Sequence, residues 1–370
     1  MRRPFALFAL LVLAAAGLDV PSWAQTRSLN VYNWSDYVEP TVIEAFSKET
    51  GINVKYDTFD ANETLETKLL AGKSGYDIVV PTAYFLQRQI QAGVFQKLDK
   101  SKLSNLRNVW PEIARRLAVY DPGNEYAVNY MWGTTGIGYN VAKARELLRP
   151  DGPIEAAMAS WDIAFKPELL DKFRDCGVHM LDSPDDIMPA ALHYLGLDPN
   201  STQPADLEKA ADLLIKVRPS VRKFNSSEYL NALATGEICL VVGWSGDIKQ
   251  AQKRAAEAKG GIEIGYAIPK GGAQMWFDNF AIPKDAHNVA EAHAFIDYML
   301  RPEVAAKNSN FLGYANGNIA SQKLVDKAVL EDRTVYPDAA TMATLYTIIA
   351  RDQRGQRLLN RLWTKIKTGR

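Results

Sequence analysis

The feature that most constrains the fold is an alternation of short apolar strands with helical stretches in the first part of the chain. Residues 29–33 alternate apolar and polar side chains, as a strand does, and residues 54–58 and 77–80 have the composition of two more strands. Helical stretches at 40–49 and 63–70 separate them. This strand–helix–strand–helix–strand order predicts an α/β fold with a parallel sheet that has helices on both faces.

The ends of these two helices carry local signals. Pro40 opens the first helix and Gly51 follows its end, which is the usual placement of the two residue types. Asn62 is placed to cap the second helix. The alternation continues, with strands expected at 137–139, 238–242, 264–268 and 280–283 and helices at 205–217, 227–235, 249–259 and 290–300. The chain of 370 residues is long enough for two domains, and no flexible tether separates them.

The first 24 residues have the layout of a cleavable secretory signal peptide. Basic residues 2–3 precede an apolar run at 5–17, which is shorter than the about 20 residues that a membrane-spanning helix needs. Small residues at Ser22 and Ala24 predict cleavage after Ala24. We therefore expect residues 1–24 to be removed on export, with a retained N-terminal anchor as the alternative.

The charge balance narrows the class of partner. The chain has 43 basic and 43 acidic residues, so its formal net charge is zero. A neutral chain is not built to bind nucleic acid or an anionic membrane by bulk attraction.

The two cysteines, Cys176 and Cys239, exclude a four-cysteine zinc site. In the oxidising compartment that export implies, two cysteines favour a disulfide. Two buried free thiols are the alternative.

Aromatic and acidic side chains gather where four of the expected strands end. Ligands of open α/β sheets bind outside the carboxyl ends of the strands. The segments that follow the strands here are 34–37, 81–85, 243–247 and 276–278. Three of them place a Trp within three residues of an Asp: Trp34 with Asp36, Trp244 with Asp247, and Trp276 with Asp278.

This combination fits an organic ammonium ligand. An aromatic face attracts a cation, and a carboxylate accepts charge-assisted hydrogen bonds from it. Several carboxylates in one cleft repel one another, so they suit a ligand with two or more positive charges and a methylene chain between them. A single Trp at a strand end is usually core and a single Asp is usually a helix cap, so the prediction depends on the coincidence of the pairs.

The candidate catalytic and metal-binding motifs in the sequence are all incomplete. The four histidines show no metal-ligand spacing. Residues 136–141 lack the third glycine of a dinucleotide fingerprint, and 243–247 match a nucleophile elbow only in part. Residues 182–186 are acidic but lack the calcium-loop pattern. We therefore expect no enzymatic activity, no cofactor and no metal site.

Four segments carry a resemblance to a known family: YNWSDY at 32–37, GYDIVVP at 75–81, YMWGTTGIGYN at 130–140 and WFD at 276–278. Through them the chain resembles the periplasmic polyamine-binding proteins of bacterial ABC importers, and the likeness runs over essentially the whole mature chain. The resemblance implies a two-lobed periplasmic binding protein of the type II kind, with the ligand in a cleft between the lobes. It implies that 25–135 with about 260–325 form one lobe, and about 136–259 with about 326–370 the other.

The resemblance also implies individual roles. The aromatic walls of the family are matched by Trp34, Tyr37, Trp244, Trp276 and Tyr314. Its ammonium-binding carboxylates are matched by Asp36, Asp247 and Asp278, and its small polar contacts by Ser35 and Thr82. Asp186 lies where family members often carry a longer Glu, and Cys176 and Cys239 match the family's disulfide.

The preferred polyamine is indicated by a few positions. Trp276 and Tyr84 are similar to those of spermidine-preferring members, whereas Asp247 and Ser183 are similar to those of putrescine receptors. We expect spermidine to be preferred and putrescine also to bind.

The expected setting is the periplasm, with a monomeric protein, a permease of an ABC transporter as its partner and no nucleic acid. The alternatives are a receptor for another small cationic or neutral solute, a polyamine sensor for a membrane signalling partner, and an exported enzyme on a similar fold.

Overall fold

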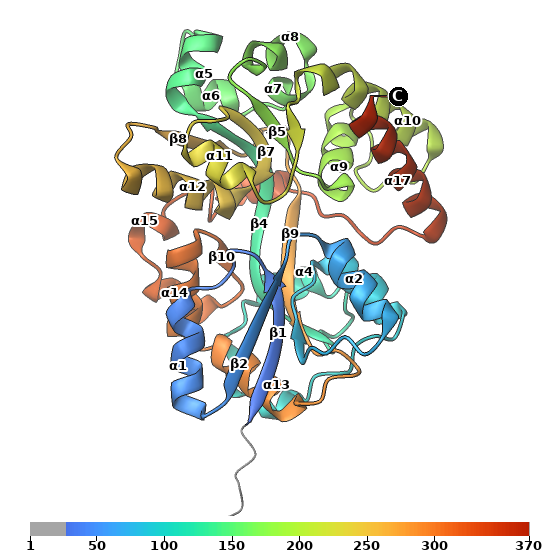
Figure 1. Ribbon diagram of the computed structural model, residues 1–370, viewed down its shortest axis with the longest axis vertical. Helices are drawn as coiled ribbons and strands as arrows, with labels where there is room; N and C mark the ends of the chain where they lie inside the picture. Colours follow the sequence, from blue (N-terminus) through green and yellow to red (C-terminus); the bar gives the residue numbers. More distant parts are fainter. Residues whose placement is uncertain (1–26, 370) are drawn as a thin grey trace, which may run out of the picture.

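The computed structural model describes residues 27–369, which form two α/β lobes, one above the other in Figure 1. The expected signal peptide, residues 1–24, lies outside the described residues. The strands are β1 (Ser28–Trp34), β2 (Asn53–Phe59), β3 (Ile78–Val79), β4 (Ala127–Asn140), β5 (Val178–Met180), β6 (Lys223–Phe224), β7 (Leu240–Trp244), β8 (Ile264–Ala267), β9 (Met275–Ala281) and β10 (Ala315–Asn316). This mixed α/β architecture confirms the predicted fold class.

The strand order is β2-β1-β3-β9-β4-β7-β5-β6, with β8 and β10 also paired to β4. β1 pairs in parallel with both β2 and β3, as the strand–helix alternation predicts. β9 comes from much later in the chain and lies antiparallel between β3 and β4. The lower lobe is therefore completed by a strand far from its other strands in sequence.

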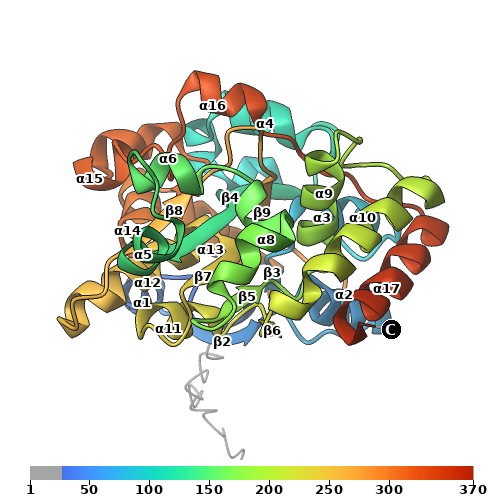
Figure 2. The same cartoon turned by 90° about the horizontal axis from the view of Figure 1, so that it is seen from above.

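Side chains of β1 reach two cores on opposite faces of the sheet. Leu29 and Val31 are fully buried in the core that includes residues of α1 (Pro40–Thr50) and α13 (Val289–Met299). Tyr32 faces the other way, into the core that includes residues of α2 (Asn62–Ala71). Burial on both faces, at roughly 25 cal/mol for each Å² of apolar surface, holds the strands between helical layers. Figure 2 shows helices on both sides of the central strands.

The long strand β4 belongs to both lobes. Its first part, 127–134, pairs with β9, and its last part, 135–140, pairs with β7 and β8. Figure 1 shows it running from the lower lobe into the upper one beside β9. The sequence pattern predicted only 137–139 as a strand, because the preceding residues contain glycine and polar side chains that hide its apolar periodicity.

We propose lobe boundaries from this pairing. The first crossing lies at Thr134–Thr135, close to the expected residue 135. The expected second boundary is near 260, and because β8 pairs with the upper part of β4 we propose 268–274 for it instead. The third crossing, near 326, stays a prediction.

The helix-end predictions have mixed outcomes. Pro40 begins α1 and Gly51 ends it in the left-handed conformation, with φ of 71°. Asn62 does not cap α2, because it is itself the first helical residue and Ala61 is the cap. The Asn62 side chain is hydrogen-bonded to Thr82 instead. A hydrogen bond to a residue distant in the sequence has therefore replaced the capping bond that the local pattern predicted.

The remaining helices surround these strands. They are α3 (Ala83–Gln91), α4 (Pro111–Leu117), α5 (Val141–Leu148), α6 (Ile154–Met158), α7 (Asp162–Phe165), α8 (Pro167–Leu170), α9 (Pro184–Tyr194), α10 (Pro204–Val217), α11 (Tyr229–Ala234), α12 (Ser245–Ala258), α14 (Pro302–Leu312), α15 (Lys327–Leu330), α16 (Ala339–Thr344) and α17 (Gln353–Thr368). α17 closes the upper lobe by packing against α9 and α10. None of the helices within residues 27–369 is long and apolar enough to cross a membrane.

Cys176 and Cys239 form a disulfide, as predicted, with their Cα atoms 5.7 Å apart. The bridge joins the turn before β5 to the residue before β7, and these two strands are paired. It therefore fastens β5 to its neighbour β7, one strand inside the edge strand β6.

Candidate ligand-binding site

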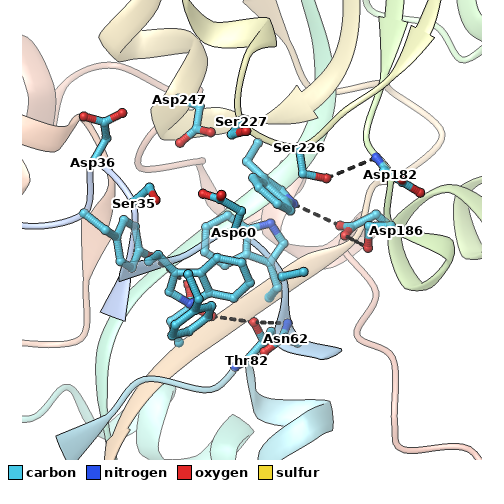
Figure 3. A pocket seen from close by; sticks show the side chains of 18 of the residues that line it. Ser35, Asp36, Asp60, Asn62, Thr82, Asp182, Asp186, Ser226, Ser227 and Asp247 are labelled. Atoms are coloured by element: carbon cyan, nitrogen blue, oxygen red, sulfur yellow. Dashed lines mark hydrogen bonds between the residues drawn. The ribbon is translucent and has the colours of Figure 1, made fainter. Parts of the chain in front are cut away.

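One cavity between the lobes is lined by every residue that the sequence analysis predicted as a ligand contact. The lower lobe supplies the segments after β1 and β3, and residues of β9. The upper lobe supplies the start of α9 and the β7–α12 turn. The predicted residues that line the cavity are Trp34, Ser35, Asp36, Tyr37, Thr82, Tyr84, Asp186, Trp244, Asp247, Trp276, Asp278 and Tyr314. Figure 3 shows side chains from both lobes converging on it.

Asp278 is a buried carboxylate of the lower lobe that lines the cavity, with 5% of its surface exposed. Its Oδ1 accepts a hydrogen bond from the Thr82 hydroxyl at 2.7 Å, and its Oδ2 accepts one from the Tyr37 hydroxyl at 2.9 Å. Burial raises the pKa of Asp278 to about 7, although these two donors act in the opposite direction. Both donors are neutral, so the carboxylate has no cationic partner among the residues that bond it.

Asp247 of the upper lobe is held in the same way, by two neutral hydroxyl groups. Its Oδ1 accepts a hydrogen bond from the Tyr314 hydroxyl at 2.6 Å, and its Oδ2 accepts one from Tyr229 at 2.7 Å. Burial raises the pKa of Asp247 to about 6. Tyr314 follows α14 in the lower lobe, so the Tyr314–Asp247 bond joins the two lobes directly.

Asp186 is a third carboxylate, at the start of α9. It is buried, and it accepts hydrogen bonds from Thr135 at 2.6 Å, Ser183 at 2.6 Å and the Trp244 indole N–H at 3.2 Å. Burial raises the pKa of Asp186, against the effect of these donors. A carboxyl with three donors is already well fixed in position.

Asp36 differs from the other three carboxylates. Its side chain is 57% exposed and pairs with Arg254 of α12 at 3.2 Å. Its backbone adopts the left-handed conformation, with φ of 51°, which turns the side chain toward the rim of the cavity. The structure therefore brings Asp36 to the cavity but gives it a cationic partner from the opposite lobe.

The aromatic walls meet mostly edge to face. Trp34 approaches Trp244 across the lobes, with ring centres 5.8 Å apart. Tyr314 stands between Tyr37 and Trp276, with ring centres 5.2 Å and 5.4 Å away. A Cβ at position 246 would collide with the Tyr314 ring, so Gly246 lets this ring lie over the start of α12. These contacts hold the rings at fixed angles around the cavity.

The smaller predicted contacts lie at the lower-lobe end. Thr82 accepts a hydrogen bond from Asn62 at 3.0 Å while it donates to Asp278. The Ser35 backbone N–H donates to Phe59 at 3.1 Å, which fixes the turn after β1. Tyr84 is buried beside Phe85 in α3.

Several lining residues were missed by the sequence analysis. They are Phe59, Asp60, Ala61, Asn62, Glu63, Asp182, Ser226, Ser227, Leu230 and Gln274. Ser183, which was named only as an indicator of the preferred polyamine, also lines the cavity. The segment 59–63 follows β2, so the strand-end rule could have found it had that strand been included in the survey. The strands before 182–183 and 226–227 have only three and two residues, which is too short to recognise from a pattern.

The cavity is acidic and aromatic. Seven of its lining residues are acids, namely Asp36, Asp60, Glu63, Asp182, Asp186, Asp247 and Asp278, and none is Lys or Arg. An anionic ligand would meet these carboxylates without a basic counterpart on the wall. The chemistry therefore favours a cation with apolar segments between its charges.

These features define an extracellular solute-binding protein: two α/β lobes, a strand shared between them, and a polar-and-aromatic cavity where they meet. Residues 41–335 match the family described as bacterial extracellular solute-binding protein, and the chain belongs to that family.

Individual relatives of this chain are named for the solutes that they bind. The chain is 49% identical to the putrescine-binding periplasmic protein SpuD of Pseudomonas aeruginosa over 360 residues, which cover 97% of each chain. It is also 49% identical to the putrescine-binding periplasmic protein PotF of Escherichia coli over 348 residues, 94% of this chain and 93% of PotF. Among solved structures, the spermidine/putrescine substrate-binding protein PotD of Streptococcus pneumoniae superposes with a TM-score of 0.75 at 30% identity, covering 93% of this chain and 99% of PotD.

Proposed function

We propose that this protein captures polyamines, spermidine or putrescine, by closing its two lobes around them, and delivers them to an ABC importer. The observation that supports this most directly is the set of enclosed carboxylates, Asp278, Asp247 and Asp186, whose hydrogen-bond donors are all neutral. A polyamine ammonium would supply the positive charge that these donors lack. The names of the relatives, which include putrescine-binding and spermidine/putrescine-binding proteins, point the same way.

The twelve predicted contact residues would then divide by role. The aromatic side chains would cover the methylene chain, and the carboxylates would bind the ammonium groups. Because contacts come from both lobes, a bound polyamine stabilises the closed arrangement by its differential affinity for it. Closure removes water from each ion pair and so strengthens it.

The proposed setting is the periplasm, reached by export and removal of residues 1–24. There the protein would act as a monomer without catalysis, and the closed form would be recognised by a membrane permease. Edman sequencing of periplasmic protein should begin at Gln25. A mature protein that still carries the apolar run would contradict this part of the proposal.

Isothermal titration calorimetry with spermidine, putrescine, an amino acid and a sugar tests the function. We expect binding of at least one polyamine at micromolar concentration and none of the other solutes. Thermal shift should show the same selectivity, because a ligand that binds only the folded state raises the melting temperature. If neither polyamine bound at that concentration, the proposed function would be wrong.

A further inference from the structure

Gln274 lines the cavity with a side chain that has no hydrogen-bond partner. It lies directly before β9 and forms an isolated bridge with Tyr346, so its backbone is extended. In extended chain, alternate residues face the same side, which places Gln274, Trp276 and Asp278 on the cavity face. Gln274 is 1% exposed, and neither its amide oxygen nor its amide nitrogen is hydrogen-bonded within residues 27–369.

An unpaired buried amide is costly, because it has lost water without gaining a partner. Glutamine is therefore an unexpected residue for a wall that only has to exclude water. A methionine or leucine would fill similar space without the cost.

Gln274 is tied to Asp186 through one residue. The Thr135 backbone N–H donates to the Gln274 carbonyl oxygen at 3.0 Å, and the Thr135 hydroxyl donates to Asp186 Oδ1 at 2.6 Å. Asp186 Oδ1 has two donors, whereas Oδ2 has one, from Ser183. A carboxylate oxygen can accept two hydrogen bonds, so Oδ2 keeps one acceptor position.

Tyr346 adds a second unpaired group to the same neighbourhood. Its backbone pairs with both neighbours of Gln274, through Met275 N–H at 2.8 Å and Ala273 oxygen at 3.1 Å. Its hydroxyl is buried and without a partner among the described residues. Tyr346 is not among the residues that line the cavity, so of these two unpaired groups the Gln274 amide is the one placed to meet a ligand.

We propose that Gln274 is a specificity-determining contact, whose amide oxygen, together with Asp186, accepts hydrogen bonds from the third amino group of a triamine. This inference rests on the proposed polyamine function and adds the ligand class to it. Gln274 and Asp278 are four positions apart in extended chain, which is about 13 Å along the strand direction. A diamine held by Asp278 and Asp247 needs no contact at the Gln274 end, whereas a triamine has one more nitrogen to place there.

The test compares two buried glutamines. Gln274→Met removes the amide at similar volume, and Gln89→Met is the matched control, because Gln89 is fully buried in α3 with both amide atoms unpaired and does not line the cavity. Calorimetry with spermidine as the triamine and putrescine as the diamine is run on both variants and on the natural chain. We expect Gln274→Met to weaken spermidine binding about tenfold and to change putrescine binding less than threefold. Gln89→Met should change neither.

Equal losses for both amines, or no loss for spermidine, would overturn the inference. If the natural chain bound neither amine, the proposed function would fail first, so the two failures are distinguishable. Gln274→Glu keeps the test decisive if the Met variant is poorly folded. The added carboxylate should raise the ratio of spermidine to putrescine affinity, and an unchanged or lower ratio would contradict the inference.

Discussion

Asp278 and Asp36 are both acidic residues of the lower lobe that line one cavity, yet their surroundings are opposite. Asp278 is buried and is held by the neutral hydroxyls of Thr82 and Tyr37. Asp36 is mostly exposed and already pairs with Arg254 of the other lobe. The sequence analysis gave the two residues the same role.

The difference teaches what a carboxylate must lack in order to bind a cationic ligand. A carboxylate held by hydroxyls is fixed in place but keeps its negative charge, so an ammonium can still neutralise it. A carboxylate paired with arginine has its charge matched inside the protein, and we propose that Asp36 mainly helps to hold the lobes together. The following predictions test this contrast, from the largest expected effect to the smallest.

Asp278→Asn should weaken polyamine binding by about hundredfold, equivalent to roughly 3 kcal/mol, because an enclosed ammonium would lose its counter-charge. Calorimetry with spermidine and putrescine measures the loss. The same Asp-to-Asn change at position 36 is the matched control. Affinity within threefold of the natural chain would mean that the ligand site lies elsewhere.

Asp247→Asn should weaken binding at least tenfold by the same mechanism. We expect the loss to be smaller than at Asp278, because Asp247 is only partly buried and solvent can screen its charge. The Tyr314 hydroxyl, which donates to Asp247, can still bond an Asn oxygen, so lobe contact is retained. A larger loss of affinity for Asp247→Asn than for Asp278→Asn would contradict the expectation that the more buried carboxylate contributes more to binding.

Lowering the pH from 8 to 5 should weaken binding about tenfold, because Asp278 and Asp247, with pKa values of about 7 and 6, take up protons in this range. Stability of the ligand-free protein should change in the opposite direction. Between about pH 4 and 7 the folded state holds more protons on these groups than the unfolded state, so stability falls as the pH rises.

Melting temperatures at several pH values, with and without polyamine, check both signs in one experiment. Stabilisation by the ligand should grow as the pH rises. In Asp278→Asn, the pH dependence of the ligand-free protein in this range should become smaller, and the part that Asp247 contributes should remain. An unchanged pH profile in that variant would show that Asp278 is not one of the groups that titrate in this range.

Asp36→Asn should weaken binding less than threefold, because exposed ion pairs contribute only about 0.2–1 kcal/mol. Arg254→Gln should have a similar effect, and the double variant should be no weaker than either single one if the two residues act as a pair. A tenfold loss on Asp36→Asn alone, with Arg254→Gln neutral, would make Asp36 a direct ligand contact.

Much of this arrangement could be predicted from the sequence. The rule that ligands bind beyond strand ends identified Trp34 and Trp244 with their acidic neighbours, and these residues line the cavity. Trp276 and Asp278 also line it, but the expectation that they follow a strand is wrong, because they lie inside β9. Local periodicity identified β1, β2 and β3 and their parallel pairing. Asp186 and Tyr314 came only from the family resemblance.

The rest depends on tertiary contacts that local patterns do not encode. Asp36 pairs with Arg254, which is more than two hundred residues away in the sequence. Asn62 is of a residue type that often caps helices, but it does not cap α2 and its side chain is hydrogen-bonded to Thr82 at the ligand cavity instead. The sequence analysis did not identify Gln274 as a contact, because a single glutamine gives no signal that distinguishes a cavity-lining residue from a solvent-exposed one.

The late position of β9 has a consequence for when the protein can fold. β9 fills the gap between β3 and β4, so the sheet of the lower lobe stays incomplete until residues 275–281 are available. Pairings between distant segments are slow to form. For a chain that we propose is exported, this order keeps the nascent protein from completing its first lobe early, which suits threading through a translocation pore. Native-like near-ultraviolet circular dichroism in a fragment of residues 27–270 would contradict this view.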